Sequence, residues 1–372
     1  MSESPAYLTG QLIAYRGGKR KLLGLLAEAL GLVTKRLGCR KLSIFDGFSG
    51  TGVCSRFFKQ YASLLIANDL QPYAAALARC FLTNRSDIDF ARLETAVADL
   101  EIRKFDECSG FIQRLYAPAD DTNIKLGERA YFTCRNAQIL DGTCLRLASV
   151  DEQLRPLILG PLLAEASLRS NTAGHFKGFI KDKNTGIGRF GGAADARVGR
   201  MTPTIALRLP VLSNYECEHR VYSKDVNEVA ASLEEIDVAY FDPPYDTESY
   251  GALYWMLNLL VNYEEPERVS KITGVPHNWI RSDYTRKNGV EELLTALIEK
   301  TPARFILLSY SNEGKISPER VEAMLGRSGT FSFLEQRHRR FNSSHQSTKH
   351  GTRGTRYARP PVVERLYVLE KR

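Results

Sequence analysis

The stretch KLSIFDGFSGTGVCSRFFKQYASLLIAND, residues 41–69, predicts the fold of the chain. Residues 41–46 have the apolar pattern of a buried strand and lead directly into a glycine-rich loop at 47–52. A helical pattern follows, and a second apolar strand at 64–67 ends at Asn68-Asp69. Strand, glycine loop, helix, strand and acid in this order indicate the βαβ unit of a nucleotide-binding α/β domain.

The residues of this loop suit a nucleotide-like ligand. Gly47, Gly50 and Gly52 allow a tight turn and a close approach of the backbone to the ligand. Asp69, at the end of the second strand, is placed to accept hydrogen bonds from ribose hydroxyls. The loop does not match the dinucleotide fingerprint closely, and no Lys-Ser/Thr pair follows the glycines, which argues against a phosphate-binding P-loop.

A basic turn precedes this unit. Residues 14–21, AYRGGKRK, stand before an apolar helix that begins near Leu22. Free N–H groups and the helix dipole at such a start could bind an anion. A capped surface helix explains the same residues equally well.

The motif Asp242-Pro243-Pro244-Tyr245 follows the apolar strand 236–241. Proline has no backbone N–H and cannot continue a central strand, so the two prolines predict a rigid turn with free carbonyl oxygens. A carboxylate, carbonyl oxygens and a flat ring in one small space suit binding of an exocyclic amino group and stacking on its base. An ordinary strand-ending turn is the alternative, because Asp-Pro is a common turn signal.

The α/β alternation stops between residues 86 and 214. It resumes at 220–226 and continues through the strand before Asp242 to another apolar strand at 305–310. We therefore expect a discontinuous catalytic domain, 1–85 and 215–372, interrupted by an insert at 86–214. A helix is expected within 151–170.

Residues 171–200 of the insert are rich in glycine and cations, with aromatic residues between them. This composition suits a surface that contacts nucleic acid, although a flexible structural insertion fits equally well. The candidate DNA-binding cations of this segment are Lys177, Lys181, Lys183 and Arg189.

A second basic segment lies near the C-terminus. No acidic residue stands between Glu335 and Glu364, in a chain of formal net charge +8. This uneven charge is more consistent with phosphate contact than with general solubility. A disordered tail is less fitting, because 365–370 has a strand pattern that would hold the segment at both ends. The cations of this interval are Arg337, Arg339, Arg340, Lys349, Arg353, Arg356 and Arg359.

Composition limits the class of protein. Of 372 residues, 43% are hydrophobic and 25% charged, as expected of a soluble globular protein. No apolar run approaches the roughly 20 residues that cross a membrane, and residues 1–5 lack a signal-peptide pattern. The seven cysteines are scattered and the six histidines do not cluster with them. We expect reduced thiols, a cytoplasmic location and no bound metal.

These motifs, in this order, resemble the Dam-like (alpha-group) adenine-N6 DNA methyltransferases, in the arrangement where the target-recognition insert precedes the catalytic motif. Residues 15–20 resemble the family's N-terminal cofactor motif and 45–52 its glycine loop. Asn68-Asp69 matches the ribose-binding acid, 242–245 the catalytic motif, and 308–314 is also similar. The resemblance implies a Rossmann-like methyltransferase domain with an inserted, largely helical and loop-rich target-recognition domain.

The resemblance further implies S-adenosylmethionine as the cofactor. The residues it assigns to the cofactor are Tyr15, Gly18 and Lys19 at the amino-acid end, Asp46, Gly47, Gly50 and Gly52 along the loop, Asp69 at the ribose, and Asp225 with Val226 at the adenine. Asp225 alone could equally cap a helix.

The reaction that follows is methyl transfer to N6 of an adenine flipped out of duplex DNA. Tyr245 would stack on the base, while the Asp242 carboxylate and the Pro243 carbonyl would accept the amino hydrogens. A bacterial or phage source, and a cognate restriction endonuclease as partner or an orphan role, are compatible with this reaction.

Three other functions compete. The same motif permits methylation of RNA adenine or of another planar amino group, such as a protein glutamine. A DNA-binding module with an inactive fold is disfavoured by the intact loop and motif, and a dinucleotide oxidoreductase would leave the Pro-Pro-Tyr turn unexplained.

Overall fold

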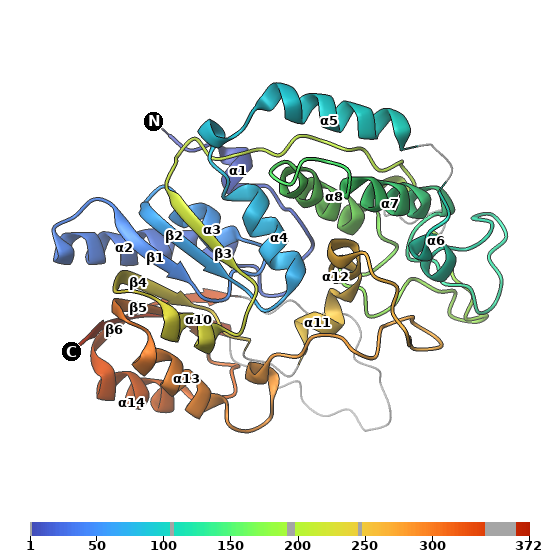
Figure 1. The fold of residues 1–372 in the computed structure, drawn as a ribbon. Coiled ribbons are helices and arrows are strands. Elements are labelled where there is room, and N and C mark those ends of the chain that lie inside the picture. The colour runs from blue at the N-terminus through green and yellow to red at the C-terminus, as the bar shows by residue number, and fades with distance from the viewer. Residues whose placement is uncertain (1, 105–107, 192–197, 245–247, 339–361) are drawn as a thin grey trace, which may run out of the picture.

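A computed structural model describes the chain apart from residues 1, 105–107, 192–197, 245–247 and 339–361. Within the described residues, one sheet with the strand order β3-β2-β1-β4-β5-β7-β6 runs through the molecule (Figure 1). The strands are β1 Leu42–Asp46, β2 Ala62–Asn68, β3 Glu218–Tyr222, β4 Ile236–Phe241, β5 Ala303–Ser311, β6 Gly329–His338 and β7 Val362–Lys371.

The strand order creates a switch point between β1 and β4. From β1 the chain moves outward through β2 and β3, and then returns to the other side of β1 with β4 and β5. These five strands are parallel, whereas β7 is antiparallel to β5 and to β6. In such sheets a crevice forms beyond the carboxyl ends of the strands at the switch point. Asp46, paired in register with Tyr240, therefore ends β1 near the turn that contains Asp242.

Helices cover both faces of the sheet, because successive side chains of a strand point to opposite faces and both faces are apolar. Ile44 faces a core with one group of helices, and its neighbour Phe45 faces a core with the other group. The first group is α2 Leu23–Leu37, α3 Val53–Phe58 and α4 Pro72–Phe81, and the second is α10 Val226–Ser232, α13 Val290–Lys300 and α14 Pro318–Ser328. The predicted α/β fold with a central sheet is confirmed.

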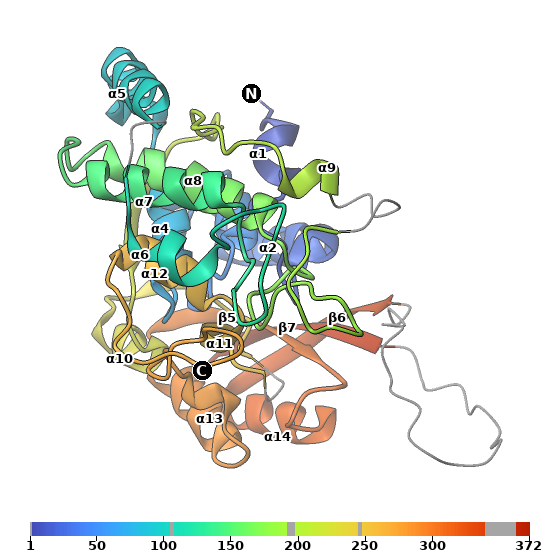
Figure 2. The ribbon, with the colours of Figure 1, turned by 90° about the vertical axis from the view of Figure 1, so that its right-hand side faces the viewer.

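A helical layer lies beyond α4, above the sheet in the view of Figure 2. It contains α5 Phe90–Arg103, α6 Phe111–Tyr116, α7 Cys134–Leu147, α8 Arg155–Arg169 and α9 Val198–Met201, together with α11 Tyr250–Leu253 and α12 Trp255–Asn262. The short elements α1 Pro5–Thr9, η1 Lys19–Leu22, η2 Arg85–Asp87 and η3 Asp283–Thr285 complete the described helices. The helix expected within 151–170 is α8.

This layer shares one apolar core with the catalytic part of the chain. Tyr73 and Leu77 of α4 pack with Leu162 of α8 and with Met256 and Leu257 of α12. The interruption of the α/β pattern after residue 85 is therefore visible in the structure, and the division at 86–214 stays a prediction.

Two aromatic residues of 171–190 are buried, and so do not fit the interpretation of this segment as a surface that contacts nucleic acid. Phe176 and Phe179 are 2% and 8% exposed, because they pack against Trp255 and Tyr131 in the helical core. The buried Asn171 side chain donates to the carbonyl oxygens of Ala130 and Arg189 and fixes this segment. These two rings are therefore structural and do not offer a surface for stacking bases.

Candidate active site

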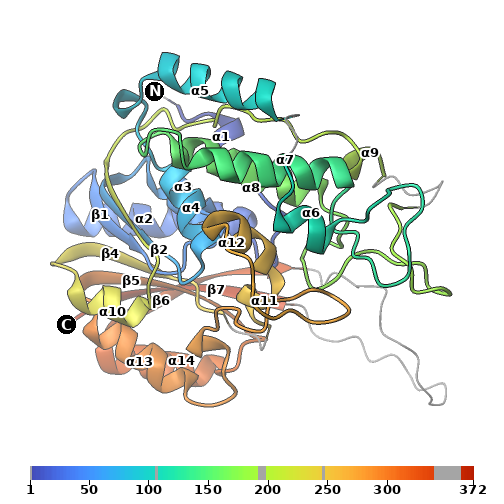
Figure 3. The same cartoon turned by 45° about the vertical axis from the view of Figure 1, so that its right-hand side comes forward.

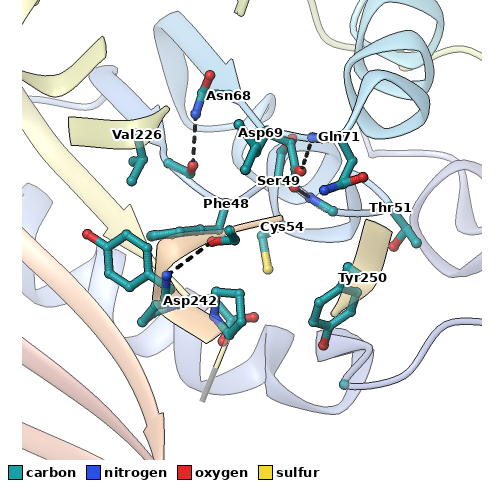
Figure 4. Close-up of a pocket in the computed structure, with 18 of the residues that line it drawn as sticks. Phe48, Ser49, Thr51, Cys54, Asn68, Asp69, Gln71, Val226, Asp242 and Tyr250 are labelled. Carbon is teal, nitrogen blue, oxygen red and sulfur yellow. Dashed lines mark hydrogen bonds between the residues drawn. The ribbon is translucent and has the colours of Figure 1, made fainter. Parts of the chain in front are cut away.

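A pocket opens at the carboxyl ends of β1, β2 and β4, at the switch point of the sheet (Figure 4). Its wall combines the basic turn, the glycine loop, the end of β2, the start of α10 and the turn after β4. The predicted cofactor residues in this wall are Tyr15, Gly18, Lys19, Gly47, Gly50, Asp69, Asp225 and Val226, and the predicted catalytic residues are Asp242, Pro243 and Pro244. Asp46 and Gly52 are not among the lining residues, and Tyr245 lies outside the described residues.

The glycine loop has the geometry that its sequence predicts. Gly50 and Gly52 have φ angles of 52° and 74°, in the left-handed region where a side chain is strained. At Gly47 the reason is space, because an added Cβ would lie 2.8 Å from the Phe241 ring and 2.9 Å from Val226. Glycine at these positions keeps the pocket open between β1 and α3.

Asp69 helps to build the loop as well as the pocket. Its Oδ2 accepts from the Gly50 N–H at 2.8 Å and its Oδ1 accepts from the Gln71 N–H at 2.8 Å. Burial raises the pKa of Asp69 to about 6, while these two backbone donors act in the opposite direction. Each carboxylate oxygen can accept further hydrogen bonds, so a contact to a ribose stays open.

Asp46 is fully buried beneath the loop. Its Oδ2 accepts from the Ser55 hydroxyl, whereas its Oδ1 has no hydrogen-bond partner among the described residues. Burial raises the pKa of Asp46 to about 7. The hydroxyl oxygen of Ser49, which lines the pocket, also lacks a partner in the described part of the chain. Buried polar atoms are usually satisfied, so these atoms indicate a polar ligand.

The basic turn directs Lys19 into the protein. Lys19 is 7% exposed in η1, and its Nζ lies 2.9 Å from Asp242 Oδ1. The same ammonium pairs with Glu364 of β7. The turn therefore supplies a buried cation to two carboxylates, which neither the anion-site nor the surface-helix interpretation anticipated.

Asp242 is the partly exposed member of the ion cluster formed by Lys19, Asp242 and Glu364. Its side chain is 17% exposed, and Lys19 Nζ lies 2.9 Å from its Oδ1. Burial raises the pKa of Asp242 to about 6, Lys19 opposes that shift, and Glu364 adds to it. Above that pKa the turn presents an ionised carboxylate to the pocket, with capacity to accept further hydrogen bonds.

Asp225 caps a helix and lines the pocket at once. Its carboxylate accepts from the Asn227 N–H at 2.8 Å at the start of α10. The capping alternative is confirmed by this contact, and a further role beside the cofactor is a separate proposal.

The sequence analysis missed several pocket residues. The ring centroids of Phe48 and Tyr284 lie 5.0 Å apart, edge to face, and those of Tyr15 and Tyr250 lie 5.2 Å apart. Figure 4 shows Phe48 and Tyr250 in the pocket. Tyr250 and Tyr284 carry no local motif, so only the fold brings them here. Glu364 did carry a signal, because it is an acidic residue on the same strand face as the apolar Leu366 and Val368.

The predicted DNA-binding cations that the structure describes are not among the residues that line the pocket. Lys183 and Arg189 are exposed, Lys177 pairs with Glu248 at 2.5 Å, and Lys181 stands over the Phe179 ring. Arg337 lies 3.9 Å from Glu335. The remaining predicted cations, Arg339, Arg340, Lys349, Arg353 and Arg356, lie outside the described residues.

Comparison with known proteins decides the class. Residues 15–324 match the family model of the D12 class N6 adenine-specific DNA methyltransferases. The chain belongs to this family. The predicted adenine-N6 DNA methyltransferase is thereby confirmed.

Two similar proteins match this chain over nearly their whole length, and a third matches it over less than half of its own. The type II methyltransferase M.NlaIII of Neisseria lactamica is 27% identical over 96% of this chain and 99% of its own length. M.CviAII of Paramecium bursaria Chlorella virus 1 is 25% identical over 89% of this chain and 93% of its own length. M.FokI of Planomicrobium okeanokoites is 27% identical over 81% of this chain but 46% of its own length.

No described helix is long and apolar enough to cross a membrane. No group of three or more histidine, cysteine or acidic side chains in the described ranges could hold a metal ion. The seven cysteines, all in described segments, are free thiols.

Proposed function

We propose that this DNA adenine methyltransferase acts on an adenine flipped out of duplex DNA, with Asp242, Pro243, Pro244 and Tyr245 as its catalytic residues. The observation that carries the proposal is the Asp242 carboxylate at the edge of the pocket, which Lys19 Nζ holds at 2.9 Å from Oδ1. A flipped base fits this role because its amino group brings donors that the carboxylate can still accept.

S-adenosylmethionine fits the remainder of the pocket. The unpartnered Asp46 Oδ1 and Ser49 Oγ atoms suit its polar groups, and Gly47 and Gly50 of the loop line the pocket without side chains. When bound, it supplies a methyl group already activated by the positive sulfur. The chain residues that would hold it are Tyr15, Gly18, Lys19, Asp46, Gly47, Gly50, Gly52, Asp69, Asp225 and Val226.

Asp242 prepares the amino group for attack. Its carboxylate and the Pro243 carbonyl accept the two amino hydrogens, which keeps the nitrogen lone pair from delocalising into the ring. Both acceptors are fixed in place, Asp242 by Lys19 and Pro243 by its ring, so little reorganisation precedes the reaction. The carboxylate must be ionised for this role, which the pKa of about 6 permits at neutral pH.

The region 86–214 is proposed as the target-recognition part of the protein. Its loops extend outward past α6 (Figure 3), and Lys183 and Arg189 are exposed on them. Exposed cations can neutralise backbone phosphates, and those of 337–356 would add to this charge. The names of the relatives support a cognate restriction endonuclease as partner, and we place the enzyme in a bacterial or phage-infected cytoplasm.

Asp242→Ala is the experiment that tests the catalytic role. We expect it to abolish methyl transfer while cofactor binding, measured by titration, stays within a few fold. The assay is expression in cells without adenine methylation, followed by modification-sensitive sequencing of their DNA. Methyl-adenine in one short motif from the wild type and none from the variant supports the proposal.

Two other outcomes would overturn parts of it. Near-normal methylation by the variant would remove Asp242 from the mechanism. Methyl-adenine without a common motif in the wild type would mean that the region 86–214 contacts the DNA backbone and not the bases.

A further inference from the structure

Glu364 is a buried acid on an apolar strand. It is 6% exposed in β7, on the face where Leu366 and Val368 pack into the core beneath α2. A carboxylate in such a place is stable only with partners. Neither the catalytic motif nor the proposed cofactor contacts use Glu364, so its burial requires another explanation.

The partners of Glu364 connect it to the catalytic turn. Its Oε1 accepts from Lys19 Nζ and from the Ser309 hydroxyl, the latter at 3.0 Å. Ser309 lies on β5, the strand between β7 and β4, and is fully buried. The same Lys19 Nζ lies 2.9 Å from Asp242 Oδ1. One ammonium therefore stands between two carboxylates from strands that are not neighbours.

Lys19, Asp242 and Glu364 together carry a net negative charge when all three are ionised. Asp242 and Glu364 carry two negative charges when ionised, against one positive charge on Lys19. Each carboxylate attracts the ammonium, so the position of Lys19 depends on both. If only Asp242 attracted it, no contact from β7 would fix the ammonium, and the orientation of the Asp242 carboxylate would be less well defined.

We propose that Glu364 is a positioning residue for methyl transfer: by sharing the Lys19 ammonium with Asp242, it fixes the cation that orients the Asp242 carboxylate, while that carboxylate keeps acceptor capacity for the amino hydrogens. The proposal rests on the catalytic role proposed above for Asp242. Ser309 acts with Glu364 by fixing the carboxylate through its hydroxyl.

The charge of Glu364 also affects the titration of Asp242. The groups that face Asp242 from the elements packed around it are Lys19 of η1, Asp46 of β1, Cys54 of α3, Tyr240 of β4 and Glu364 of β7. Glu364 raises the pKa of Asp242, so removal of its charge lowers that pKa. Because Asp242 acts as the ionised acceptor, the methyl-transfer rate falls at low pH as Asp242 is protonated. This acidic limb of the pH–rate profile must then move to lower pH.

Glu364→Gln tests the proposal, since glutamine keeps the shape and an acceptor oxygen but loses the charge. We expect the single-turnover rate on duplex DNA to fall about tenfold on the high-pH plateau, with the acidic limb displaced to lower pH. Glu364→Asp, which keeps the charge, should retain the wild-type limb. Glu370→Gln is the matched control on the same strand, because Glu370 pairs with the exposed Arg36 and Arg304, and its profile should not change.

A uniform loss of rate with an unmoved limb would overturn the proposal and leave Glu364 a structural residue. If Glu364→Gln does not fold, the profile of Glu364→Asp decides, since a displaced limb in that variant contradicts the charge argument. Carbon-13 NMR titration of the aspartate carboxyls gives a readout independent of activity. If the wild type methylates nothing, the catalytic proposal fails, while a lower Asp242 pKa in Glu364→Gln would still support the charge coupling.

Discussion

The two halves of the pocket are built in different ways. The glycine-loop half, from Asp46 to Asp69, comes from one continuous βαβ unit, and hydrogen bonds within it join residues fewer than 25 positions apart, such as Gly50 with Asp69. The catalytic half brings together Lys19, Asp242, Ser309 and Glu364 from four separate elements. The first half depends on local backbone geometry, and the second depends on the order of strands in the sheet.

The largest effect is expected in the catalytic half, from Lys19→Met. This change leaves two buried carboxylates without their shared cation, so we expect the methyl-transfer rate at neutral pH to fall about 100-fold or more. Lys19 lowers the pKa of Asp242, and its removal must raise that pKa. The acidic limb of the rate profile should therefore move to higher pH, opposite to the displacement expected for Glu364→Gln.

The control for this change is Lys21→Met, on the exposed side of the same η1 turn, which should keep the wild-type profile. If the acidic limb of the Lys19→Met profile moves to lower pH or does not move, Lys19 does not lower the pKa of Asp242. The contrast between the two halves of the pocket would then fail.

This contrast also explains what the sequence could predict. The βαβ unit, the strand before Asp242 and the turn after it follow from local patterns, because strand periodicity, glycine and proline act over a few residues. The pairing of Glu364 with Lys19 does not, since it requires β7 to lie beside β5 and not at the edge of the sheet. The burial of Phe176 and Phe179 does not follow from local patterns either, because the helical core that covers them forms only in the fold.

The second prediction addresses the glycine-loop half. Gly47→Ala places a Cβ against Phe241 and Val226, which belong to separate buried elements and cannot both move easily. We expect a loss of about 1–3 kcal/mol of unfolding free energy, with weaker cofactor binding. Thermal unfolding and cofactor titration measure the two effects. Gly24→Ala is the control, because this glycine is exposed in α2 with open space around it, and alanine there should be neutral or stabilising.

The smallest effect is expected at Asp225, where the loop half meets α10. Asp225→Ala removes the helix cap and should reduce the unfolding free energy by about 1 kcal/mol. Asp225→Ser keeps a capping oxygen but loses the carboxylate, so it separates the two roles of the residue. If Asp225 also contacts the cofactor, the serine variant should unfold like the wild type yet bind S-adenosylmethionine more weakly. Wild-type affinity in the serine variant would leave Asp225 a capping residue alone, and the adenine end of the cofactor would then depend on Val226 and the aromatic pair of Phe48 and Tyr284.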